Sequence, residues 1–99
     1  MTVVWSDRAL HNLIEIGRYI ATEKPLAAQR LTWRFRERVR MLVRTPLIGR
    51  TVPEWDDVGL REVVEQGYRI IYRVESDRIT IVTIRDGRRH FPDEPQEPG

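Results

Sequence analysis

The spacing of apolar residues predicts that the chain begins with a short strand and a helix. Thr2–Trp5 is a β-prone run, and after it apolar residues recur at helical spacing. Ser6 offers an N-cap, and Asp7 places a negative charge in the first turn, where it favours the helix dipole. We expect this helix from about Asp7 to Glu23. Its predicted apolar stripe is Leu10, Leu13, Ile14, Gly17 and Ile20.

A second helix is predicted directly after the first. Pro25 suits the first position of a helix, and the helix should end before Pro46. Almost no linker separates the two helices, so they should form an antiparallel hairpin. The predicted apolar stripe of the second helix is Ala28, Leu31, Thr32, Phe35, Val39, Leu42 and Val43.

The second half of the chain predicts a loop and three strands. Thr45–Asp57 contains Pro46, Gly49 and Pro53 and is expected to be a loop. The pairs "QG" and "SD" then separate the strand candidates as tight hairpins. These candidates are Leu60–Glu65, Tyr68–Glu75 and Arg78–Arg85. The order β-α-α-β-β-β predicts an α+β fold, with the helical hairpin packed on one face of a small, mainly antiparallel sheet.

Alternation along the strands predicts which side chains the helices cover. In the central strand the covered residues are Tyr68, Ile70, Tyr72 and Val74, and the opposite face carries Arg69, Ile71, Arg73 and Glu75. In the last strand Ile79, Ile81 and Thr83 should lie opposite Thr80, Val82 and Ile84. Arg69 and Arg73 therefore need not be buried. Two interpretations are open: solvated arginines with cross-strand partners such as Glu65 or Glu62, or a basic groove on an uncovered sheet.

Composition limits the remaining possibilities. The chain has 99 residues, enough for one domain, which we place at residues 1–91. Residues 92–99 are acidic and proline-rich, and we expect them to be disordered. No apolar run is long enough to span a bilayer, there is no signal-peptide pattern and there is no cysteine, so a cytoplasmic location is expected.

Arginine dominates the basic residues, because Lys24 is the single lysine among 17 basic side chains. A GC-rich genome explains this bias, and so does a function that uses the planar guanidinium to bind carboxylates or phosphates. The net charge is only +2, so any such function depends on local patches. Arg85, at the end of the last strand, and Arg88 and Arg89, after the Asp-Gly turn, form a candidate anion site.

Catalytic and metal-binding patterns are weak. His11 and His90 are far apart, and neither has metal-ligand spacing to another donor, so no metal or other cofactor is expected. His11 should lie on an exposed helix face, whereas His90 can be considered as a general base. Neither serine has a nucleophile pattern, and no glycine loop cradles a phosphate.

Several motifs resemble the RelE/ParE superfamily of toxins from type II toxin–antitoxin systems. They are "YIATEKPLAAQR", "P-x-x-GR-x-V-P-E" from Pro46 to Glu54, "LRE", "GYRIIYRV" and "IRDGRR". Their order and spacing match the superfamily from Val3 to His90, and its fold agrees with the one predicted above. The resemblance implies a cognate antitoxin as partner, expected to be a ParD-like ribbon-helix-helix protein.

The resemblance also implies one of two targets. RelE-type members are ribosome-dependent mRNA endoribonucleases, and their arginines match Arg69 and Arg89 here. Their two lysines fall on Leu60 and Glu62, and their late tyrosine falls near Pro95. The chain is therefore interpreted as ParE-like, a gyrase inhibitor that causes growth arrest and stabilises plasmids without catalysis of its own.

Two alternatives stay open: a ribonuclease that uses Arg69, Arg89 and His90, or a non-toxic module that binds an antitoxin. In each case the candidate contact residues for antitoxin or target are arginines. They are Arg30, Arg34, Arg38, Arg61, Arg69, Arg73, Arg85, Arg88 and Arg89.

Overall fold

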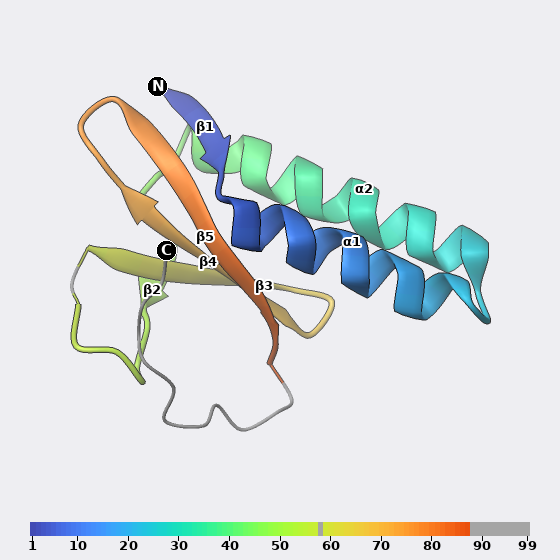
Figure 1. Cartoon of the computed structure of the whole chain (residues 1–99). Coiled ribbons are helices and arrows are strands. Elements are labelled where there is room, and N and C mark those ends of the chain that lie inside the picture. Colours follow the sequence, from blue (N-terminus) through green and yellow to red (C-terminus); the bar gives the residue numbers. More distant parts are fainter. Residues whose placement is uncertain (58, 88–99) are drawn as a thin grey trace.

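The protein folds as a helical hairpin laid across one face of a five-stranded sheet (Figure 1). The structure is a computed structural model and describes residues 1–57 and 59–87. The helices are α1 (Asp7–Ala21) and α2 (Pro25–Leu42). The strands are β1 (Thr2–Trp5), β2 (Arg50–Thr51), β3 (Leu60–Glu65), β4 (Tyr68–Val74) and β5 (Arg78–Asp86). The predicted α+β class and the placement of the helices are confirmed.

The strand order in the sheet is β1-β5-β4-β3-β2. β1 runs parallel to β5, and the other three pairings are antiparallel. The turn between β3 and β4 has positive φ at Gln66 (54°) and Gly67 (85°), as a two-residue hairpin of the primed type requires. Since this turn depends only on adjacent residues, it could be predicted from "QG" alone.

Ser6 caps α1 and also ties it to the sheet. Its hydroxyl oxygen accepts a hydrogen bond from the amide of Ala9 at 3.0 Å and donates to the carbonyl of Val82 at 2.8 Å. Asn12 makes a second tie, because its Oδ1 accepts from the amide of Ile84 at 3.0 Å. These contacts place the first turns of α1 directly over β5. α1 ends at Ala21, two residues earlier than predicted, and α2 ends at Leu42, before Pro46 as predicted.

The apolar stripe predicted for α2 is largely buried, but the stripe predicted for α1 is only partly correct. In α2 the buried residues are Ala28, Leu31, Phe35, Val39 and Leu42. In α1 the buried residues are Ala9 and Leu13, whereas Leu10 and Ile14 are 42% and 51% exposed. Each lies one position after a buried residue, about 100° around the helix, and therefore on the flank of α1.

The predicted faces of β4 are confirmed. Ile70 and Tyr72 belong to the main core under the helices, and Tyr68 packs there edge-on against Phe35, with ring centroids 5.6 Å apart. Ile71, on the other face, belongs to a second, smaller core.

The prediction for β5 holds as far as Val82, which lies in the second core, and fails beyond it. The pairing with β4 skips Val82, because Ile81 and Thr83 face consecutive residues of β4. A β-bulge of this kind shifts the alternation by one residue. Ile84 therefore joins Ile79 in the main core, although strict alternation predicted the opposite face for it.

The segment predicted as a loop, Thr45–Asp57, contains the short strand β2 and covers part of the second face of the sheet. Val52 is buried there with Leu60, Ile71 and Val82, and Trp55 packs against them. The second face is therefore less open than the sequence indicated. This correction determines the surroundings of Arg69. Among the described residues, no helix is long and apolar enough to cross a membrane.

Candidate functional site

Arg69 is enclosed by two carboxylates on the second face of the sheet. Its Nε donates to Glu62 Oε1 at 2.7 Å, and its Nη1 and Nη2 donate to Glu54 Oε2 and Oε1 at 2.7 and 2.6 Å. Glu62 comes from the neighbouring strand β3, whereas Glu54 comes from the loop. Arg69 is only 6% exposed, so the prediction that it lies on an uncovered face is wrong. The predicted cross-strand partner Glu62 is correct.

Glu62 is itself buried and bridges two arginines. Its Oε2 accepts from Arg50 Nε at 2.6 Å, while its Oε1 faces Arg69. Arg50 lies opposite Glu62 in the β2–β3 pairing, and the side chain of Glu62 has no exposed area. We call these four residues, Arg50, Glu54, Glu62 and Arg69, the ion network. Two positive and two negative charges compensate one another, which is the condition for burying charges at tolerable cost.

The contact between Arg69 and Glu54 shifts the pKa values of both residues. Hydrogen bonds from Arg69 hold the pKa of Glu54 below its ordinary value of 4.5, although burial opposes this shift. Hydrogen bonding to Glu54 raises the pKa of Arg69 further, again against burial. Both shifts favour the charged forms, so Glu54 and Arg69 stay ionised at neutral pH. Arg69 has no deprotonated form that could serve as a base.

Tyr72 lies in the main core, on the face of β4 under the helices, and holds the start of the covering loop, Thr45–Asp57. Its hydroxyl donates to the carbonyl of Pro46 at 2.8 Å and accepts from the amide of Gly49 at 2.9 Å. Arg61 donates to the carbonyl of Gly49 at 2.8 Å. Burial raises the pKa of Tyr72, so its hydroxyl stays protonated as a donor. Arg61, predicted as a contact residue, thus has a structural role.

Asp57 anchors the end of the same loop. Arg73 Nη2 donates to Asp57 Oδ2 at 3.0 Å, and the amide of Gly59 donates to Oδ1 at 2.9 Å. The pKa of Asp57 is lowered, first by the hydrogen bond from Arg73 and then by the one from Gly59. Arg73 is half-buried beside this carboxylate. Its guanidinium therefore adds little net positive charge to the surface.

Arg85 lies directly opposite Arg69 in the β4–β5 pairing. Its guanidinium carbon lies 5.9 Å from the centre of the Trp55 ring, within reach of a cation–π contact. Arg69 and Arg85 are therefore both covered by consecutive loop residues, Glu54 and Trp55. The predicted cluster of Arg85 with Arg88 and Arg89 cannot be described, because Arg88, Arg89 and His90 lie outside the described residues.

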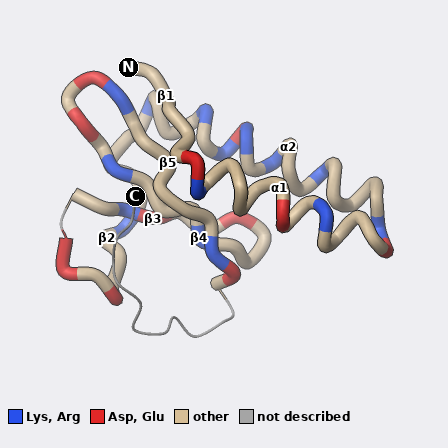
Figure 2. The backbone as a smooth tube through the Cα atoms, viewed as in Figure 1, with Lys and Arg blue, Asp and Glu red and all other residues tan. Residues whose placement is uncertain are grey.

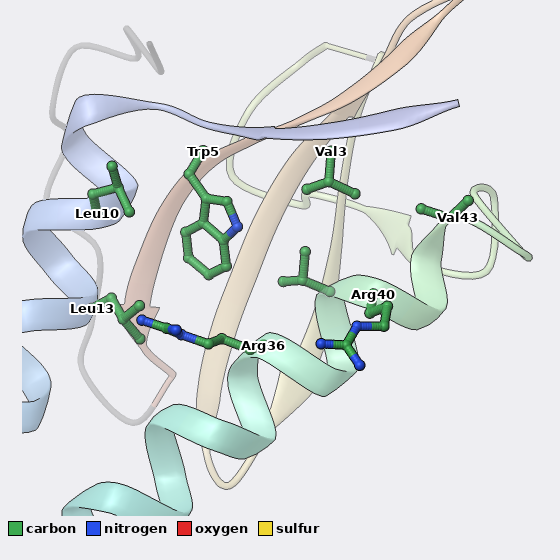
Figure 3. Close-up of a pocket in the computed structure, with 8 residues that line it drawn as sticks. Val3, Trp5, Leu10, Leu13, Arg36, Arg40 and Val43 are labelled. Atoms are coloured by element: carbon green, nitrogen blue, oxygen red, sulfur yellow. The ribbon is translucent and has the colours of Figure 1, made fainter.

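A groove with apolar walls lies on the other side of the molecule, beneath the edge of β1 (Figure 3). Val3 and Trp5 point from β1 toward α2, and Arg36 reaches from α2 toward Leu13 on α1. The volume of the groove is about 420 Å³. Its lining residues are Val3, Trp5, Leu10, Leu13, Arg36, Val39, Arg40 and Val43. The exposed side chain of Leu10, unexpected for a core stripe, belongs to this groove.

Basic residues follow α2 along much of its length (Figure 2). Arg30 and Arg34 are exposed and Arg38 is half-buried, so these three predicted contact residues lie on the helix surface. Glu37, one turn before Arg40 on α2, pairs with it at 2.9 Å. The sequence missed Arg36 and Arg40 as groove residues. Their spacing of one turn beside Val39 and Val43 was the available signal.

The described residues contain neither a cluster of three or more His, Cys, Asp or Glu side chains able to hold a metal ion nor a histidine beside Arg69. His11 is on the exposed face of α1, as predicted.

The motif "P-x-x-GR-x-V-P-E" has a structural explanation, because Gly49 contacts Tyr72, Arg50 contacts Glu62 and Glu54 contacts Arg69. These contacts hold the covering loop against β3 and β4, and arginine-rich surfaces lie around them.

The fold and these motifs define a toxin domain of the RelE/ParE superfamily. The profile of the family "ParE toxin of type II toxin-antitoxin system, parDE" matches residues 3–91, so the chain belongs to the ParE toxin family. It is also similar to the protein named toxin RelE2 of Caulobacter vibrioides, with 40% identity over 88 residues, which cover 88% of this chain and 96% of the relative. The placement in the superfamily is thereby confirmed, whereas the names of these relatives do not separate a ParE-like from a RelE-like mode of action.

Solved structures agree on the fold. The chromosomal ParDE system of P. aeruginosa aligns with a TM-score of 0.74 at 22% identity, over 87% of this chain and 95% of that one. The RelBE2 toxin–antitoxin complex of Mycobacterium tuberculosis aligns with a TM-score of 0.64 at 20% identity, over 86% of this chain and 95% of that chain. The YoeB dimer of Staphylococcus aureus aligns with a TM-score of 0.64 at 14% identity, over 92% of this chain and 98% of that chain. These structures show the fold, and the family match shows that the protein is a toxin of a type II toxin–antitoxin system.

Proposed function

We propose that this toxin inhibits DNA gyrase in the cytoplasm through protein–protein contact and performs no chemistry of its own. The observation that carries the proposal is the enclosure of Arg69 by Glu54 and Glu62. Arg69 is the position that matches an RNA-contacting arginine of RelE-type enzymes, and here its guanidinium already binds two carboxylates. Membership of the ParE family supports the same conclusion.

The surroundings of Arg69 disfavour RNA cleavage. Cleavage needs groups that activate the ribose 2′-hydroxyl, stabilise negative charge on the phosphorane and protonate the leaving oxygen. Glu62 stands where a cation would be needed, and Leu60 is buried in the second core. A phosphate approaching Arg69 would meet the negative charges of Glu54 and Glu62. It would have to displace Glu54 from a bidentate pair.

We also propose that a cognate antitoxin neutralises the toxin by covering the groove beneath β1 and the basic surface of α2. The groove offers apolar area from Val3, Trp5 and Leu10. Arg36 and Arg40 beside it would attract acidic side chains. An antitoxin of the ribbon-helix-helix type with an acidic, amphipathic C-terminal segment fits this surface. A small reading frame of that kind beside the toxin gene would support the pairing.

The decisive experiment measures supercoiling by purified gyrase with the toxin added. We expect inhibition that is reversed when the cognate antitoxin is added in equal amount. Supercoiling that is unaffected by a large excess of toxin contradicts the proposal. Primer extension on mRNA bound to ribosomes tests the RelE-like alternative: cuts at codons that disappear in Arg89→Ala would establish a ribonuclease. Normal growth on induction without antitoxin would identify a non-toxic module.

A further inference from the structure

Trp33 lies on the solvent side of α2, away from the sheet. It is 61% exposed, and it belongs to neither hydrophobic core of the described residues. It precedes the buried Phe35 by two positions, which is about 200° around the helix, so the two side chains point to nearly opposite sides. Trp33 is also not among the residues that line the groove beneath β1. Packing of the fold therefore does not explain a tryptophan at this position.

Two further large apolar side chains share this side of α2. Leu26 and Met41 are 64% and 61% exposed, and they lie within about 80° of each other and of Trp33 around the helix axis. The row of three extends over about 22 Å, since each helical residue adds about 1.5 Å. Single exposed apolar residues are ordinary, whereas a patch of them marks a site of interaction.

Positive charge is concentrated on the same helix. α2 carries five arginines against one acid, Glu37, whereas α1 balances two arginines with two acids. The blue segments along α2 in Figure 2 show this excess. Glu37 pairs with Arg40 at 2.9 Å, so its charge is compensated. Arg30 and Arg34 are exposed, about one turn before Trp33 and directly after it.

The exposed side of α2 thus has an apolar centre line with a basic rim. We call its five residues the outer face of α2. They are Leu26, Arg30, Trp33, Arg34 and Met41.

This combination favours a protein as the occupant of the outer face. The centre of a protein interface is apolar and its rim is polar, and Trp and Arg are prominent among the residues that carry its binding energy. A nucleic acid binds largely through its phosphates to basic and polar donors, and Leu26 and Met41 offer none. A second copy of this chain would bring another arginine-rich α2 against the first, and like charges would repel. A partner surface with an apolar pocket and acidic residues around it fits instead.

We propose that the outer face of α2 is the surface through which the toxin binds its protein target. Trp33 enters an apolar pocket of the target, and Arg30 and Arg34 pair with carboxylates beside that pocket. This inference rests on the proposed function, since it takes gyrase as the target. It places the contact on the side of α2 that faces away from the sheet, and it gives the ion network around Arg69 no part in target binding.

Binding of toxin variants to purified gyrase in the absence of DNA tests the apolar centre line. Trp33→Ala should bind at least about tenfold more weakly than the native toxin, and half-inhibition of supercoiling should need correspondingly more of it. Tyr19→Ala is the matched control, because Tyr19 is an exposed aromatic residue of α1. Both variants should keep the urea midpoint of the native protein, since neither side chain is buried. Equal affinities of Trp33→Ala and Tyr19→Ala would overturn the proposal.

Charge reversal tests the basic rim. Arg30→Glu/Arg34→Glu should also lose about tenfold or more in affinity for gyrase, because both arginines would be replaced by charges that repel an acidic surface. Arg8→Glu/Arg18→Glu, at two exposed positions of α1, is the control with the same change in net charge. Equal losses in the two double variants would show that only net charge acts, and the outer face would not be the contact.

Three further results separate the alternatives. A loss of affinity in Trp33→Ala that occurs only when DNA is present would assign the outer face to DNA and overturn the proposal. Self-association of the toxin that Trp33→Ala abolishes would assign the face to a second copy, with the same consequence. Native toxin that neither binds nor inhibits gyrase contradicts the proposed function itself. Inhibition that is unchanged in Trp33→Ala and in Arg30→Glu/Arg34→Glu removes only this surface and leaves the proposed function standing.

Discussion

Glu54 binds both terminal nitrogens of Arg69, at 2.7 and 2.6 Å, across a separation of 15 residues in the chain. This fork-to-fork pair joins a loop residue to the central strand of the sheet. Paired with Glu62 on its other side, Arg69 becomes a structural residue of the second face. The charge of Arg69, near the start of β4, is therefore accommodated by the covering loop, and not by exposure to solvent.

Removing Arg69 should destabilise the protein strongly. Arg69→Met leaves Glu62 buried with only Arg50 beside it, and breaking such buried pairs costs about 3–5 kcal/mol. The free energy of unfolding, measured by urea denaturation, should fall accordingly. Arg18→Met is the matched control, because its contact with Glu15 is 3.7 Å long and exposed. Its effect should stay within about 0.5 kcal/mol.

If Arg69→Met unfolds at the same urea concentration as the native protein, the ion network has no structural role. For the same reason Arg69→Glu is unsuitable as a test of antitoxin binding. Arg69→Glu places a third carboxylate beside Glu54 and Glu62, so any loss of antitoxin binding would report unfolding. Arg30 and Arg34, which are exposed on α2, are better probes of contact through charge.

Tyr72 should contribute through its hydroxyl as well as its ring. Tyr72→Phe leaves the amide of Gly49 and the carbonyl of Pro46 without their shared partner, at a cost of about 1–3 kcal/mol. Tyr19→Phe is the control, because Tyr19 is 78% exposed. Urea denaturation of both variants checks this prediction. Equal unfolding midpoints of Tyr72→Phe and Tyr19→Phe would contradict it.

Two glycines should respond to alanine with opposite signs. A Cβ on Gly49 would lie 2.5 Å from the Tyr72 hydroxyl and 2.6 Å from the carbonyl oxygen of Glu62, so Gly49→Ala must displace the loop. A Cβ on Gly17, inside α1, would meet only the Thr32 methyl at 3.4 Å. Gly17→Ala should stabilise the protein by about 0.5–1 kcal/mol through helix propensity. Thermal unfolding of the pair is the measurement, and a stabilised Gly49→Ala would show that the loop is not held as described.

Stability should fall in acid through Glu54. The pKa of Glu54 is lowered in the folded protein, chiefly by hydrogen bonds from Arg69. Its contribution is therefore fully present above the ordinary value of 4.5 and is lost as the pH falls through the lower, folded value. The same direction holds for Asp57, below its ordinary value of 3.8. In Glu54→Gln the difference in unfolding free energy between pH 7 and pH 3 should be smaller than in the native protein.

Glu15→Gln is the control for that comparison, because Glu15 makes only a long, exposed contact with Arg18. An acid dependence of Glu54→Gln equal to that of the native protein would contradict the role of Glu54. Protonation of Glu54 would then not explain a loss of stability in acid.

Much of the fold could be predicted because its signals are local. The positions of α1, α2, β3, β4 and β5 follow from periodicity, and the start of α2 follows from Pro25. The candidate site was less predictable. Arg36 and Arg40 became groove residues only because β1 packs beside the end of α2, and no local pattern reports which strand will lie at the edge of the sheet. Glu54 was part of a motif, but its partner is 15 residues away.

The sequence by itself determined both helices, every strand except β2, the two hairpins and the two faces of β4, because helical and strand periodicity and turn chemistry act over a few residues. The tertiary structure decided the rest. The bulge at Val82 moved Ile84 to the other face, since register depends on two strands at once. The covering loop buried Arg69, since it brings Glu54 to it from a distant part of the chain. Burial and ion pairing are properties of the assembled layers, and only the packed chain defines them.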